Sequence, residues 1–343
     1  MQNKLSIYLI ISFLLLFLLA IFSLYMGVYE FESSFWEIIK SFFSSETAVS
    51  ETDKFVFSDL RLSRIVMAVL IGSALAVSGA CLQGMFKNPL ASPDLIGITS
   101  GASLFAAIAI VLGSFIKPHI PEVFHFSFLS ISAFVGAFIT MSVVYKISTT
   151  GGKTNVMMML LSGVAITALG FAVMGLLIYI SKDEQLRDLT FWNLGSLGGA
   201  TWTKNLILFC VIILSYFFLI GKGKTLNAMM LGEKDATHLG IPVEKTKKQI
   251  VLFTALLVGA SVAFSGTIGF VGLIIPYILR LIFKSNYYII LPLSAVLGSV
   301  LLLGADTISR TVVAPSEIPI GILTAFMGAP IFIMILLKHR KSL

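Results

Sequence analysis

Charged residues are scarce in this sequence. Only 12% of its 343 residues are Asp, Glu, Lys or Arg, 57% are hydrophobic, and the mean hydropathy is +0.98. A soluble globular domain usually carries about twice that share of charge, roughly 25%. The composition therefore excludes a water-soluble protein, and we expect a lipid bilayer to be its solvent. The net charge of +7 follows the membrane topology described below, so no nucleic-acid partner is expected.

Cysteine and histidine are also rare. Cys81 and Cys210 both lie in apolar runs, which excludes a disulfide framework and favours buried packing. The four histidines lie in loops or in the tail, and no His-Glu-x-x-His motif occurs. An intramembrane protease is therefore disfavoured, and we expect neither a metal site nor a catalytic residue in this chain.

A phosphate-binding loop is missing as well. The tripeptide Gly-Lys-Thr occurs at 152–154 and at 223–225, but the glycine required five residues earlier is replaced by Ile147 and Phe218. The chain is thus expected to hold no cofactor, and any ATP and Mg would be bound by a partner.

Ionisable groups are also expected to be absent from the membrane centre. Asp94, Asp306, Arg310 and Glu317 fall near the ends of the apolar runs. Carriers driven by protons or sodium keep such groups near the bilayer midplane. This pattern argues against an ion-coupled carrier and in favour of an external motor.

Apolar runs of membrane-spanning length are abundant. A span needs about 20 apolar residues, and ten candidates occur, at about 5–26, 62–82, 95–115, 126–147, 156–180, 201–220, 249–268, 270–283, 288–306 and 318–337. With the N-terminus in the cytoplasm, most lysines and arginines fall on the inner side, so the positive-inside rule places both termini there. We predict an all-α, multi-pass protein of about ten transmembrane helices.

A repeat divides the chain into halves of about 1–182 and 183–343 within a single domain, 1–343. The block 72–79 (Gly-Ser-Ala-Leu-Ala-Val-Ser-Gly) matches 259–266 (Gly-Ala-Ser-Val-Ala-Phe-Ser-Gly), and Pro89 matches Pro276 at the same offset. Five helices per half would place the second half upside down, a feature of transporters. Chance similarity between small-residue helices is the alternative.

Several blocks, in order from about residue 58, resemble the FecCD type of permease, which in ABC importers carries iron-siderophore, haem or cobalamin. They are Leu-Arg-Leu-Ser-Arg at 60–64, Gly-x-x-Leu-Ala-x-Ser-Gly at 72–79, Leu-Gln at 82–83, Asn-Pro-Leu-Ala-x-Pro at 88–93, Gly-Phe-Val-Gly-Leu-Ile-Ile-Pro at 269–276 with Arg280, Ala-Asp at 305–306 with Arg310, Glu-Ile-Pro-Ile-Gly at 317–321 and Gly-Ala-Pro at 328–330. Ser63 and Tyr277 depart from the family, which usually has Pro and His there.

The resemblance implies a type II ABC importer. Two permease subunits, here expected to be identical, would form the pathway, with two ATPase subunits on the inner side and a periplasmic or lipid-anchored binding protein outside. Arg61, Arg64 and Arg310 match outer arginines that pair with acidic residues of the binding protein, a chemistry suited to guanidinium groups. Interfacial snorkelling, or an i,i+4 pair of Arg310 with Asp306, is the alternative.

The inner segment 221–248 resembles the coupling loop of the family, in which two short helices rest in a groove of the ATPase. The residues matched to this role are Leu231, Gly232, Glu233, Ala236, Leu239 and Gly240. Glycines and Pro242 would interrupt the helices. A merely solvated polar loop is the alternative.

The segment 186–192 (Leu-Arg-Asp-Leu-Thr-Phe-Trp) looks closest to haem permeases of the family. Arg187 and Trp192 are thus candidates for the cargo pathway, since an arginine beside aromatic groups suits an anionic porphyrin. For Arg187 the alternative is an ion pair with Asp183, Glu184 or Asp188, and for Trp192 it is anchoring at the membrane interface.

The sequence is therefore interpreted as a permease without a catalytic site of its own, moving haem inward across the bacterial cytoplasmic (inner) membrane. Import of a ferric siderophore or cobalamin by the same mechanism stays open. An ion-coupled secondary carrier and an intramembrane enzyme are the rival classes.

Overall fold

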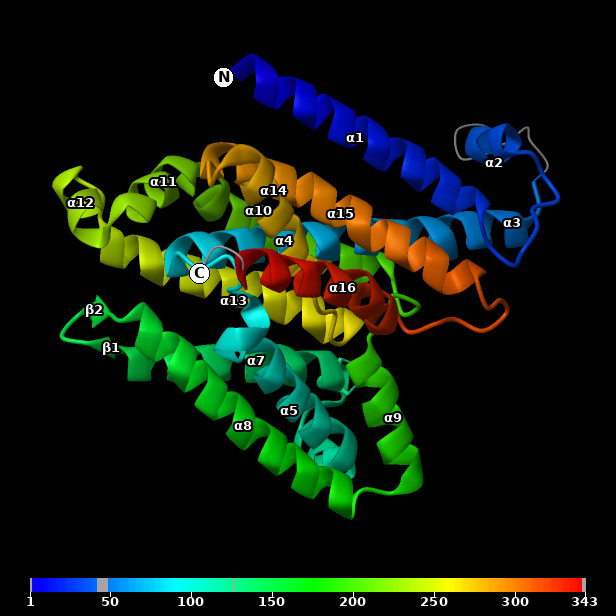
Figure 1. Cartoon of the computed structure of the whole chain (residues 1–343). Helices are drawn as coiled ribbons and strands as arrows, with labels where there is room; N and C mark the ends of the chain where they lie inside the picture. The colour runs from blue at the N-terminus through cyan, green and yellow to red at the C-terminus, as the bar shows by residue number, and fades with distance from the viewer. Residues whose placement is uncertain (1, 42–48, 126, 341–343) are drawn as a thin grey trace.

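The computed structural model describes residues 2–41, 49–125 and 127–340, which form an almost wholly helical bundle (Figure 1). The helices matching the ten predicted spans are α1 (Gln2–Tyr25), α4 (Ser63–Phe86), α5 (Ile98–Val111), α7 (Phe128–Ser148), α8 (Val156–Ile180), α10 (Trp202–Leu219), α13 (Val243–Ser265), α14 (Val271–Phe283), α15 (Tyr287–Thr311) and α16 (Ile320–Arg340). Each predicted span therefore coincides with a helix.

Short elements join these helices. They are α2 (Phe35–Ser41), α3 (Glu51–Phe55), η1 (Val56–Leu62), η2 (Pro93–Ile96), α6 (Gly113–Ile116), η3 (Lys117–His119), η4 (Glu122–Phe124), the antiparallel pair β1 (Thr149–Thr150) and β2 (Lys153–Thr154), α9 (Asp183–Leu194), η5 (Ile220–Lys222), α11 (Gly223–Leu231) and α12 (Glu233–His238). Element η1 is a π-helical turn that continues into α4.

Not all ten helices can cross a membrane alone. Within the described residues, seven helices are long and apolar enough by themselves, and α5 reaches that length only together with the stretch 113–119, from which it is bent by 68°. Helix α14 has only 13 residues, fewer than the roughly 20 that a span requires. Continuous apolar runs predict that a segment is in the membrane but not that it turns back within it.

Side-chain caps set where the long helices begin. The side chain of Asn155 accepts hydrogen bonds from the backbone N–H groups of the first turn of α8, and those of Thr201 and Asn286 do the same for α10 and α15. Such caps satisfy backbone donors that have no partner inside the helix.

Helix α4 is the centre of the bundle and packs against α10, α13, α14 and α15. A Cβ atom on Gly79 would lie 1.6 Å from the carbonyl oxygen of Gly272, and one on Gly72 would lie 2.4 Å from that of Gly298. Glycine lets these helix backbones touch, which is how membrane helices gain packing energy without a hydrophobic driving force.

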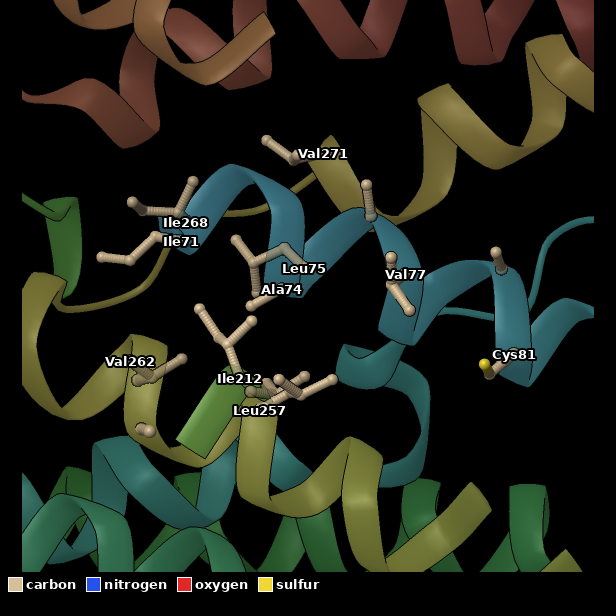
Figure 2. Close-up of a cluster of buried hydrophobic side chains, with 14 of the residues drawn as sticks. Ile71, Ala74, Leu75, Val77, Cys81, Ile212, Leu257, Val262, Ile268 and Val271 are labelled. Atoms are coloured by element: carbon tan, nitrogen blue, oxygen red, sulfur yellow. The ribbon is translucent and has the colours of Figure 1, made fainter. Parts of the chain in front are cut away.

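Apolar side chains fill the space around these crossings. Figure 2 shows Ile71, Ala74 and Leu75 of α4 facing Ile212 of α10 and Leu257 of α13, all fully or almost fully buried. By contrast, α1 lies on the outside of the bundle against α15, and only 17% of the apolar window of α8 is buried within the chain (Figure 1). These two helices leave broad apolar faces for lipid or another subunit.

Both halves follow one order of elements: a long helix, a short one, then a long one. This order is α4, α5 and α7 in the first half and α13, α14 and α15 in the second, and α4 and α13 run in opposite directions (Figure 1). The constant sequence offset is not kept in the structure, because Gly79 lies inside α4 whereas Gly266 follows the last residue of α13 with φ +68°.

The two ends of the bundle are distinguished by the short elements that they carry. The end that carries α11, α12 and the β1–β2 hairpin is called the α12 end, and the end that carries α2 and α3 is called the α3 end (Figure 1). Helix α16 runs back toward the α12 end, near which α1 also begins.

Candidate functional site

Arg64, at the start of α4, joins three segments at the α3 end. Its Nε and Nη2 atoms lie 2.9 and 2.8 Å from Oδ1 of Asp306 on α15, and its Nη1 atom lies 2.6 Å from Oε1 of Glu317. The Asp306 side chain is 0% exposed, whereas that of Glu317 is 44% exposed. The guanidinium group therefore has one buried acidic partner and one that faces solvent.

Arg61 makes its contacts with the chain segment that follows α1. Its Nη1 atom donates to the carbonyl oxygens of Leu24 at 2.7 Å and Tyr25 at 3.1 Å, and its Nη2 atom donates to that of Tyr29. The ring of Phe31 stacks on the guanidinium group at 4.5 Å. The side chain thus anchors the end of α1, and the residue is only 6% exposed.

Arg310 also holds α1. Its guanidinium group donates to the carbonyl oxygens of Ser23 and Met26, and its Nε atom lies 3.8 Å from Oδ2 of Asp306. The i,i+4 pair with Asp306 weighed from the sequence is therefore formed.

The three arginines predicted to dock a binding protein thus gather at the α3 end. Each is engaged by acceptors of its own chain, and docking stays a prediction for all three. Of the two carboxylates among these acceptors, Glu317 is exposed and Asp306 is buried, so a carboxylate from outside could take the place of Glu317 on Arg64.

A second contact orders the loop beside Arg61. The hydroxyl of Tyr29 donates to Oδ1 of Asp53 at 2.8 Å, and the backbone N–H of Ser33 donates to Oδ2 at 2.9 Å. The hydrogen bond to this carboxylate raises the pKa of Tyr29 above its ordinary value, because it stabilises the protonated phenol.

The segment predicted to couple to an ATPase forms two short helices, α11 and α12, separated by Gly232. Ala236 is buried, whereas Leu231 and Leu239 are 71% and 63% exposed. Gly240 has φ +79°, and no atom lies within 4 Å of the position of a Cβ there. The segment thus presents two apolar side chains outward on an ordered support, and ATPase coupling stays a prediction for it.

Glu233 connects this segment to a buried lysine whose role is not evident from the sequence. The Nζ atom of Lys247, on α13, lies 2.8 Å from Oε2 of Glu233 and 3.1 Å from Oε1 of Glu244. The Lys247 side chain is only 1% exposed. In the sequence it is one of several lysines before an apolar run, and only the i,i+3 spacing from Glu244 could have drawn attention to it.

The predicted cargo residues lie on α9. This helix is held against α5 by Leu189, which is buried, and by Gln185, whose amide donates to the carbonyl oxygen of Val111 at 3.1 Å. Arg187 is exposed and forms no ion pair within the described residues, so the pairing considered as its alternative is not formed. Trp192 is half-buried against the apolar core.

The depth predicted for Asp94 is wrong. This residue lines a small cavity together with Leu75, which lies halfway along α4, so its carboxylate is level with the middle of that helix and not with its end. The side chain is exposed, and Oδ1 accepts a hydrogen bond from the Thr99 hydroxyl at 2.6 Å. Residues 87–97 turn back into the bundle before α5 begins, which a count of apolar residues does not predict.

Comparison with known proteins agrees with this architecture. The chain is 38% identical over 296 residues to the hemin transport system permease protein HmuU of Yersinia pestis, covering 86% of this chain and 87% of the relative. It is 36% identical over 293 residues to the cobalamin import system permease protein BtuC of Halobacterium salinarum, covering 85% and 76%.

A solved structure described as "An inward-facing conformation of a putative metal-chelate type ABC transporter" superimposes with a TM-score of 0.82 at 32% identity, covering 96% of this chain and 98% of that one. The sequence model of the FecCD transport family matches residues 14–338. The chain belongs to the FecCD transport family.

Proposed function

We propose that this chain is the membrane-spanning permease of an ABC importer and passes its cargo inward between two subunits. The observation that carries the proposal is the α12 end, where Leu231 is the last residue of α11, Leu239 follows α12, and both side chains are exposed, in a family of transport proteins. A pair of exposed apolar residues on a rigid support suits a groove in a motor subunit. ATP and Mg would be bound and used in that subunit.

The partners follow from the surfaces of the bundle. In the assembled importer, two ATPase subunits would contact the α12 ends of the two permeases. A soluble or lipid-anchored binding protein would contact the α3 ends. A second, identical permease would pack on apolar residues of α8 that are exposed in the described structure, including Leu161, Leu169 and Leu176. The remaining apolar surface would face lipid.

The proposed location is the bacterial cytoplasmic membrane, with the α12 end and both termini in the cytoplasm. Lys153, Lys234 and Lys245 support this orientation, because all three line one hollow at the α12 end and cytoplasmic segments carry an excess of lysine. Labelling of an introduced cysteine at the hairpin, from either side of sealed vesicles, tests the orientation.

The proposed cargo is haem. The chain is about equally identical to a hemin permease and to a cobalamin permease, so sequence identity does not select the cargo. The chemistry of individual residues has to select it. Arg187 supports haem, because its guanidinium group is exposed and free of ion pairs in the described structure, and so can bind a propionate. Ferric siderophore or cobalamin is the alternative cargo.

The cargo is tested by uptake into proteoliposomes that hold this chain with its ATPase and binding protein. Haem, a ferric siderophore and cobalamin are each offered to wild type and to Arg187→Ala. We expect ATP-dependent uptake of haem alone, reduced by the substitution. Uptake of a siderophore or cobalamin instead would overturn the haem assignment but leave the import mechanism in place.

One observation favours testing an ion-coupled carrier as a second candidate. The carboxylate of Asp94 is level with the middle of α4, where coupling groups of such carriers are found. Asp94→Asn separates the two mechanisms, since it would abolish uptake by a proton-driven carrier and leave ATP-driven uptake in operation.

A further inference from the structure

Lys247 is a buried cation that the proposed function does not use. Its ammonium group donates to Oε2 of Glu233 at 2.8 Å, to Oε1 of Glu244 at 3.1 Å and to the carbonyl oxygen of Thr154 at 2.8 Å. An ammonium group has three N–H donors. All three therefore have an acceptor, and each acceptor belongs to a different element: α12, α13 and β2.

Both backbone polar groups of Thr154 form hydrogen bonds with α13. Its carbonyl oxygen accepts from Lys247, and its N–H donates to Oε2 of Glu244 at 2.8 Å. Its side chain is almost fully buried as well. The position of this residue is thus fixed by one lysine and one glutamate, both on the first turns of α13.

The residue after Thr154 is the N-cap of α8. Asn155 caps that helix by accepting hydrogen bonds from the N–H groups of Met157 and Met158 at 3.0 and 3.2 Å. A continuous series of polar contacts therefore leads from Glu233 on α12 through Lys247 and Thr154 to the first turn of α8. Coupling between distant sites travels through contiguous contacts of this kind between rigid elements.

Helix α8 is held loosely by its own chain. It is packed against α5 and α7, but only 17% of its apolar window is buried by the described residues. On the other side, α12 is joined to α13 along the chain only by the residues around Gly240, whose φ of +79° places it in the left-handed region. Lys247 adds the lateral contact that keeps α12 in a fixed relation to the hairpin.

We propose that Lys247 is a positioning residue that makes the coupling segment and α8 move as one body. This inference rests on the proposed import function. When an ATPase displaces α12, the buried ion pair carries that displacement to Thr154 and so to α8. Without the ammonium group, α12 can move while α8 stays in place, and ATP is hydrolysed without cargo movement.

The first test is the number of cargo molecules imported per ATP hydrolysed in proteoliposomes. Lys247→Met should lower this ratio by about tenfold, which is a typical size for the coupling between two sites. The ATPase should still co-purify with the permease and hydrolyse ATP. Lys247→Arg, which keeps the charge and the donors, should restore part of the ratio. Lys248→Met is the matched control, because the neighbouring lysine is exposed and forms no ion pair among the described residues.

The second test needs no cargo. Spin labels are placed at Lys234→Cys on α12 and Met157→Cys on α8, both exposed, after Cys210→Ser removes the exposed native cysteine. In the assembled complex with the ATPase, the distance between the labels should stay the same with and without ATP. In Lys247→Met the distribution of distances between the labels should broaden or shift when ATP is added. If Lys247→Met does not assemble with the ATPase, Glu244→Gln serves as the second variant.

The outcomes separate the two proposals. Absence of ATP-driven uptake by wild type would remove the import function, and the label distances would still decide the linkage. Wild-type uptake with an unchanged ratio and unchanged distances in Lys247→Met would overturn the role of Lys247 alone.

Discussion

Removal of the Arg64 side chain is predicted to destabilise the protein strongly, because it leaves a buried carboxylate without its main partner. In Arg64→Met, Asp306 keeps only the guanidinium group of Arg310, whose Nε atom lies 3.8 Å from Oδ2. Removing one member of a buried ion pair costs about 3–5 kcal/mol. The Asp306 side chain is 0% exposed, so water cannot replace the lost contact.

Two further variants separate the two acidic partners of Arg64. Glu317→Gln should cost less than about 1 kcal/mol, because Glu317 is 44% exposed and surface ion pairs contribute little. Arg64→Met combined with Asp306→Leu should be more stable than Arg64→Met alone, since replacing both charges of a buried pair with apolar groups is often neutral.

The free energy of unfolding is measured in mixed micelles by increasing the mole fraction of dodecyl sulfate and following circular dichroism at 222 nm. The structure predicts a large loss for Arg64→Met, a small one for Glu317→Gln and recovery in the double variant. Equal and small losses for both single variants would refute a structural role for the Arg64–Asp306 pair and leave only a docking role.

Three other substitutions test separate parts of the structure. Gly79→Leu should prevent folding, because its Cβ would lie 1.6 Å from the Gly272 carbonyl oxygen, whereas Gly175→Leu, with no atom within 4 Å, should express normally. Gly240→Pro should insert into membranes yet uncouple ATP hydrolysis from uptake, because proline cannot adopt the φ of +79° found at Gly240. Intact ATPase binding and intact uptake together would exclude the coupling role of the segment. Arg310→Glu should weaken binding-protein affinity measured on immobilised permease, and an unchanged affinity would rule out docking there.

The positions of the helices could be predicted from the sequence because an apolar run of sufficient length has few other stable places than the membrane. The lengths and bends of the helices could not be predicted from the sequence. The 68° bend after α5 and the return of residues 87–97 into the bundle depend on packing against α8 and α4, and hydropathy does not report packing.

In the candidate site, too, some contacts could be predicted from the sequence and others could not. The pair of Arg310 with Asp306 lies four residues apart on one helix and could be considered from spacing alone. The partners of Arg64 lie 242 and 253 residues away, and that of Lys247 on β2 lies 93 residues away. Such pairs are set by how helices are arranged in space, which one sequence does not reveal.

We propose that ATP hydrolysed by a partner drives transport through this chain. The most direct measurement is haem uptake into proteoliposomes holding the permease, its ATPase and its binding protein, with either a proton ionophore or an ATPase variant unable to hydrolyse ATP. We predict uptake that continues with the ionophore and stops with the inactive ATPase. Uptake that stops with the ionophore and continues with the inactive ATPase would exclude ATP-driven import and identify an ion-coupled carrier.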